Sequence, residues 1–206
     1  LEDREGGLWF AMLGSGLRHL PPNWRDFAVL MADNPERGGL GSTALRGVAS
    51  ARSGGLWSVG VGTTFDQIDE RGSVTRHPPA PTVLPDRRSW SVLEDAQGIV
   101  WIGQQDGLVR YDPTRGALQS WRRDSAVDAV PAGPVDLLAL APDGSVWLSA
   151  LGAGVQQRAP DGRVLANHVG AAAGLDAADT EQLEFAPDGR LWLAGASGLL
   201  RFDPAR

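Results

Sequence analysis

The chain has 206 residues, a formal net charge of -6 and 19 basic residues, all of them arginine. This acidic balance argues against a nucleic-acid partner, which usually needs a basic surface. The absence of cysteine excludes disulfide bonds and thiolate metal sites. No apolar run reaches the length of about 18 residues that a membrane-spanning helix needs, so we expect no membrane insertion in this segment.

Five tryptophans recur at nearly constant spacing along the chain. They are Trp9, Trp57, Trp101, Trp147 and Trp192, separated by 48, 44, 46 and 45 residues. A glycine stands three residues before each of them and an apolar residue directly before each of them. This spacing is close to the length of one β-propeller blade. We call these five residues the anchor tryptophans.

The first two copies of the repeat are the least regular. In the first copy, residues 1–43, strands are predicted around Trp9 and from Gly16-Leu17, and only Leu1 precedes the turn. The second copy, residues 44–89, has Trp57 in its second strand but Thr64-Phe65 where the other copies have a glycine followed by an apolar residue. We therefore expect a first copy that nearly lacks its first strand.

The third copy, residues 90–134, shows the whole pattern. A short apolar strand, Ser91–Leu93, is followed by a turn ending at Gly98 and by a second strand that carries Trp101. Gly107-Leu108 opens the third strand, and Ala117–Trp121 forms the fourth. Glycine accepts the positive φ that such tight turns require. The pattern predicts a four-stranded antiparallel meander.

The last two copies repeat this order with Asp-Gly turns, which favour hairpins. In residues 135–179 the four strands follow one another from Leu137–Leu140 to Arg163–Asn167. In residues 180–206 the third strand opens at Gly198-Leu199, and the chain stops before a fourth strand. Because the sequence begins and ends within the pattern, we expect a segment of a longer protein.

The repeat predicts an all-β fold, a β-propeller of four-stranded antiparallel blades. We expect one domain over residues 1–206, with about five blades, truncated at both ends, or an arc of a larger ring. A single meander cannot bury both of its faces, whereas stacked blades can. The anchor tryptophans are therefore predicted to fill the space between neighbouring sheets.

Two stretches resemble the two-component regulator propeller repeat. One runs from Leu1-Glu2-Asp3 through Gly6-Gly7-Leu8-Trp9 to Gly16-Leu17-Arg18. The other runs from Leu93-Glu94-Asp95 through Gly98-Ile99-Val100-Trp101 to Gly107-Leu108. The resemblance implies the periplasmic sensor region of an inner-membrane receptor with a histidine kinase or diguanylate cyclase output. It also implies a ligand that is often a carbohydrate, and it supplies no catalytic residue.

Candidate ligand-binding residues lie in or beside the long stretches that link one copy to the next. These stretches are residues 31–43, 78–89, 122–133 and 170–179. Equivalent loops of a repeat protein lie on one face, which is often the binding face. The candidates are Arg87, Arg88, Trp90, Gln104, Gln105 and Glu181. Arginine and tryptophan are frequent binding anchors.

Catalytic, metal and cofactor motifs are not found in the sequence. His19, His77 and His168 stand alone in third or fourth strands, so we expect surface histidines and no metal site. Each acidic turn holds too few carboxylates for a calcium loop.

Three functions remain open for the chain. The first is a non-enzymatic sensor that recognises a small molecule or a protein. The second is a structural unit that forms a homodimer or a scaffold. The third is a propeller lyase resembling streptogramin lyase, which would need an acid or base at the axis.

Overall fold

A computed structural model describes residues 4, 8–12, 16–20, 39–42, 44–62, 64–77, 88–168, 180–195 and 198–204. The chain divides into two compact units, Leu1–Met31 and Ala32–Arg206. In the first unit, strand β1 (Leu8–Met12) pairs antiparallel with β2 (Gly16–Leu20), so that Leu8 lies opposite Leu20.

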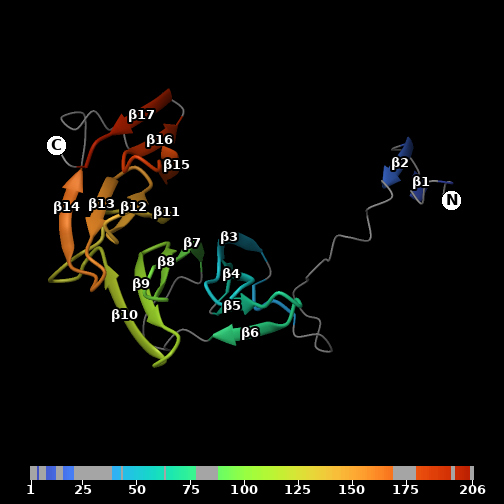
Figure 1. Cartoon of the computed structure of the whole chain (residues 1–206), viewed down its shortest axis with the longest axis horizontal. Coiled ribbons are helices and arrows are strands. Elements are labelled where there is room, and N and C mark those ends of the chain that lie inside the picture. Colours follow the sequence, from blue (N-terminus) through green and yellow to red (C-terminus); the bar gives the residue numbers. More distant parts are fainter. Residues whose placement is uncertain are drawn as a thin grey trace. The chain divides into compact units, whose positions relative to one another are not determined.

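The second unit contains four antiparallel sheets, drawn in Figure 1, and their strands follow chain order. The first sheet consists of β3 (Leu45–Ser50), β4 (Leu56–Gly60), β5 (Phe65–Ile68) and β6 (Val74–His77). The second consists of β7 (Ser89–Glu94), β8 (Val100–Gln104), β9 (Gly107–Asp112) and β10 (Ala117–Arg122). The third consists of β11 (Val135–Leu140), β12 (Val146–Ala150), β13 (Gly154–Arg158) and β14 (Val164–His168). The fourth consists of β15 (Thr180–Phe185), β16 (Leu191–Gly195) and β17 (Gly198–Phe202).

The first strands of these sheets contact one another in succession. Strand β3 contacts β7, β7 contacts β11, and β11 contacts β15. This is the arrangement of propeller blades, whose first strands line the axis and whose later strands lie progressively farther out. No helix occurs in the described residues. The predicted all-β propeller of antiparallel blades is confirmed. A separate search of the described residues for a helix long and apolar enough to cross a membrane finds none.

The hairpin turn between the first and second strands has the same construction in successive blades. The glycine three residues before the anchor has a positive φ, for example 79° at Gly98 and 83° at Gly144. Asp95 and Asp143 each accept a hydrogen bond from the backbone N–H two residues later. These aspartates are turn-forming residues. No cluster of potential metal ligands is present in the part of the chain that the structure describes.

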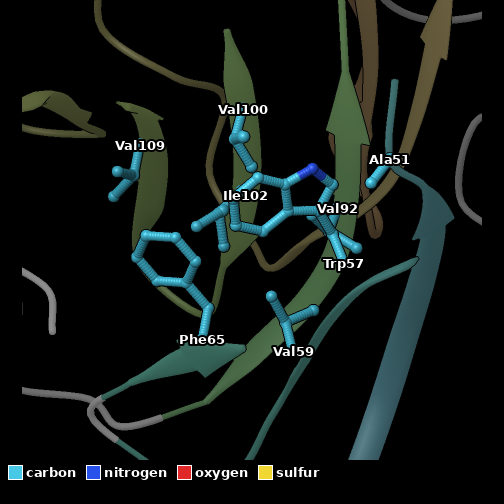
Figure 2. Close-up of a cluster of buried hydrophobic side chains, with 8 residues drawn as sticks. All are labelled: Ala51, Trp57, Val59, Phe65, Val92, Val100, Ile102 and Val109. Carbon is cyan, nitrogen blue, oxygen red and sulfur yellow. The ribbon is translucent and has the colours of Figure 1, made fainter. Parts of the chain in front are cut away.

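The anchor tryptophans of the first three sheets are buried between one sheet and the next. In Figure 2, Trp57 lies beside Val92 and Val100 of the following sheet, and Phe65 of its own sheet closes the cluster. The cores around Trp101 and Trp147 are built in the same way. The propeller core is therefore a series of repeated contacts between neighbouring sheets.

Candidate functional site

All four first strands of the second unit contain a β-bulge at the same place. The pairing with the second strand skips one residue in each, namely Arg46, Trp90, Asp136 and Glu181. Each skipped residue stands eleven positions before the anchor tryptophan of its copy. Bulges redirect side chains and are common next to active sites. Because the first strands line the axis, we call these four residues the bulge set and treat them as the candidate site.

Trp90 is the aromatic member of the bulge set and is held on two sides. The Arg46 guanidinium carbon lies 4.1 Å from the centre of its ring, which is a cation–π contact. The indole N–H donates a hydrogen bond to Gln105 Oε1 at 3.1 Å. Gln104 lies on the same edge and donates to Ser89 Oγ at 3.2 Å, whereas its buried Oε1 has no partner. Polar groups from two blades thus converge around one ring.

Asp136 is the bulge residue of β11, and its hydrogen bonds compensate only in part for the burial of its carboxyl group. Burial raises the pKa of its carboxyl from 3.8 to about 6, against the opposing effect of the backbone amides of Asp136 and Leu137. Its Oδ1 is buried and has no hydrogen-bond partner. A buried acceptor without a partner is costly, and such costs tend to concentrate at functional sites. The burial of this oxygen is therefore not compensated by a hydrogen bond within the described residues.

The substitution Asp136→Asn is therefore expected to stabilise the chain at neutral and alkaline pH. The folded-state pKa is raised, so the favourable contribution of the protonated carboxyl is complete below 3.8 and disappears as the pH rises through about 6. After allowance for solvent screening, we expect the substitution to raise the free energy of unfolding by about 1–2 kcal/mol above that pH, and by little near pH 4. Urea unfolding at several pH values measures the difference.

A matched substitution, Glu184→Gln, changes an exposed carboxylate of β15 and should leave stability nearly unchanged at every pH. A pH-independent effect of Asp136→Asn would contradict the interpretation, as would a loss of stability at alkaline pH.

The structure brings together most of the candidate residues predicted from the sequence. Trp90, Gln104 and Gln105 form one cluster. Beside them, Arg88 forms a β-bridge with Val61, and its carbonyl accepts a hydrogen bond from the Gln105 amide. Glu181 occupies the bulge position of β15 and is exposed. Arg87 lies outside the described residues, as do most of the long stretches between copies.

Sequence reasoning missed two members of the bulge set, Arg46 and Asp136. The constant distance of eleven residues from the anchor tryptophan could have identified both, because Trp90 and Glu181 were already candidates and share it.

The described histidines differ from the expected surface residues. His77 is half-buried, stacks on Phe65 and lies 3.2 Å from the hydroxyl of Tyr111 through Nδ1. His168 is half-buried and stacks on Trp147, with ring centres 5.0 Å apart. Burial lowers the pKa of both. Aromatic packing between blades accounts for these two rings, and the side chain of His19 lies outside the described residues.

These sheets, with one bulge and one anchor per blade, define a repeat-built β-propeller. Residues 83–106, which include the bulge and the anchor of the second sheet, match the family described as "Two component regulator propeller". The chain therefore carries the two-component regulator propeller repeat, which confirms the resemblance seen in the sequence. A search of curated protein sequences finds no match.

Solved structures share the fold at low sequence identity. The extracellular domain of a hybrid two-component system from B. thetaiotaomicron is 17% identical with a TM-score of 0.67, and the match covers 99% of this chain and 28% of that one. Virginiamycin B lyase from Staphylococcus aureus, in a catalytically inactive form with quinupristin, is 12% identical with a TM-score of 0.60, over 100% and 69% of the two chains. A gluconolactonase from Xanthomonas campestris is 17% identical with a TM-score of 0.54, over 77% and 58%. Sensors and enzymes thus both occur on this fold, and the chain spans about 28% of the sensor domain.

Proposed function

We propose that this chain is a non-enzymatic sensor propeller in the extracytoplasmic, periplasmic part of a bacterial transmembrane signalling receptor. The receptor would carry a histidine kinase or diguanylate cyclase output outside this segment. The proposal is supported by the two-component regulator propeller repeat and by the likeness to extracellular domains of two-component systems.

The bulge set is the observation that carries the ligand-binding part of this proposal. It places a half-buried tryptophan and two carboxylates on consecutive first strands. An aromatic face stacks on a sugar ring, and carboxylate oxygens accept hydrogen bonds from sugar hydroxyl groups. A neutral carbohydrate is the ligand class that fits both features.

The enzyme alternative has less support in the described residues. A propeller lyase requires an acid or base that converges on the axis. His77 and His168 instead lie on fourth strands and pack against aromatic rings between blades. Among the described first-strand residues, Asp136 is the group whose pKa burial raises, and no histidine lies on those strands.

Thermal unfolding in the presence of cellobiose, maltose, lactose and sucrose tests the ligand class. A sugar that binds the folded state raises the melting temperature by mass action. We expect at least one of these probes to do so, and the substitution Trp90→Ala to weaken that binding by at least about tenfold. Val127→Ala, at an exposed loop position, is the matched control that should keep it. No shift with any probe, or a shift that survives Trp90→Ala, would contradict the proposed site.

A further inference from the structure

The first three sheets of the second unit each place a ring at the same position of the fourth strand. This position pairs with the first apolar residue of the third strand. The pairs are His77 opposite Phe65, Trp121 opposite Leu108, and His168 opposite Val155. Each ring lies against the anchor tryptophan of its own sheet, with ring centres 5.2, 6.1 and 5.0 Å apart, respectively. We call His77, Trp121 and His168 the interface rings.

The next sheet covers each interface ring with the residue that pairs with the position directly before its own anchor tryptophan. The covering residues are Tyr111, opposite Val100, Arg158, opposite Val146, and Phe202, opposite Leu191. Tyr111 meets His77 edge-on with ring centres 5.6 Å apart, and Phe202 meets His168 in the same way at 4.9 Å. The guanidinium carbon of Arg158 lies 5.1 Å from the centre of the Trp121 ring. The three interfaces between blades therefore share one construction.

The second interface shows what a buried charge requires at this place. Arg158 is fully buried, and its nitrogens donate to Gln156 Oε1 and to three backbone carbonyl oxygens. A buried charge is tolerated when hydrogen-bond partners surround it in this way. The interface ring that Arg158 covers is a tryptophan, which does not titrate.

The histidines of the first and third interfaces lack such partners. The Nδ1 atom of His77 lies 3.2 Å from the Tyr111 hydroxyl, but the buried Nε2 atoms of His77 and His168 have no hydrogen-bond partner among the described residues. A neutral imidazole can leave one nitrogen without a proton, whereas an imidazolium carries a proton on both. Protonation would therefore place a charged N–H without an acceptor among aromatic rings, which costs more than a cation–π contact returns.

The charged and titratable neighbours of the two histidines do not reverse this effect. Asp66 of β5 favours the protonated form of His77, but its carboxylate is shared with Arg76, and burial lowers the pKa of His77 from 6.5. The pKa of Tyr111 is raised above 10, so its hydroxyl is neutral in acid. Burial also lowers the pKa of His168, and no charged group among its described neighbours opposes the change.

We propose that mild acid weakens the first and third interfaces between blades, at His77 and His168, and leaves the second interface closed. Because the folded-state pKa of each histidine is lowered, its stabilising contribution is complete above about pH 6.5 and is lost as the pH falls through the folded-state pKa. The propeller thus contains two pH-sensitive interfaces on either side of one that does not respond. This device is independent of the proposed ligand site.

NMR titration of the histidine Cε1 signals tests the first step on the wild-type chain. We expect the signals of His77 and His168 to titrate below 6.5, the ordinary pKa of a histidine. The substitutions His77→Gln and His168→Gln assign the two signals. A pKa at or above 6.5 for either ring would overturn the proposal.

Urea unfolding at about pH 7.5 and about pH 5 tests the consequence for the interfaces. Phenylalanine keeps a ring and does not titrate, so His77→Phe and His168→Phe should each raise the ratio of folded to unfolded chain, relative to wild type, by at least about threefold more at the lower pH. The two effects should add in the double variant, because the rings lie in different interfaces.

Trp121→Phe is the matched control at the second interface, and its effect relative to wild type should be the same at both pH values. Asp136 titrates in the same range with the opposite effect on stability, but every variant keeps it, so its contribution cancels. His77→Gln and His168→Gln repeat the comparison with a smaller side chain that does not titrate. Histidine variants whose effect relative to wild type is the same at both pH values, or a Trp121→Phe effect that changes as theirs does, would overturn the proposal.

Discussion

Replacing Trp101 with alanine is expected to lower the free energy of unfolding by about 3–5 kcal/mol, the usual cost of emptying a tryptophan site in a core. The ring is fully buried and packs with Val135 and Leu148 of the next sheet. Its indole N–H donates to Asp95 Oδ2 at 2.8 Å, so the substitution also leaves a buried carboxylate oxygen without this partner. Urea unfolding followed by circular dichroism measures the loss without depending on tryptophan emission.

Trp192→Ala provides the matched control for this prediction. It removes the same side chain at the same position of the repeat, but no described sheet of the chain covers its outer side. We expect a loss of only about 1 kcal/mol. Equal losses at the two positions would show that burial between sheets does not determine the contribution of an anchor.

The fold was predictable because the same pattern of strands and turns recurs in several copies along the sequence. Third strands begin at Gly107, Gly154 and Gly198, where the glycine followed by an apolar residue predicts them. In the irregular second copy the third strand begins at Phe65, where the sequence places it. The strands of an irregular copy can be predicted from the neighbouring copies, because every blade must bury the same faces of its sheet.

The candidate site was only partly predictable, because its defining feature is a property of strand pairing. Trp90 and Glu181 attract attention as an aromatic and a charged residue near loops, whereas Asp136 in Val135–Leu140 reads as one polar residue in an apolar strand. The register shift that sets these residues apart requires both strands to be placed. The half-buried state of His77 and His168 depends likewise on aromatic residues of their own and neighbouring sheets, at distances in sequence that no local pattern encodes.

Replacing Arg158 with alanine is expected to be the second large loss, about 3–5 kcal/mol. Arg158 is fully buried at the end of β13 and stays charged at neutral pH, although burial lowers the pKa of its guanidinium to about 10. Its nitrogens donate to Gln156 Oε1 and to the carbonyl oxygens of Gly162, Asp128 and Ala129. These bonds tie the β10–β11 connection to the third sheet, so their removal leaves several buried acceptors without these donors.

Two further variants separate the hydrogen bonds of Arg158 from its packing. The guanidinium carbon of Arg158 lies 5.1 Å from the centre of the Trp121 ring. The substitution Arg158→Met keeps an apolar side chain beside this ring and removes the hydrogen-bond donors. Lysine keeps the charge but cannot reach acceptors on several sides at once. We therefore expect Arg158→Met and Arg158→Lys to lower the free energy of unfolding by most of the amount that Arg158→Ala does. The matched control Arg190→Ala removes an exposed ion pair with Asp188 and should change the free energy of unfolding by less than about 0.5 kcal/mol. A methionine variant as stable as wild type would show that apolar packing, and not the bonds to the carbonyl oxygens, fixes the connection between the second and third blades.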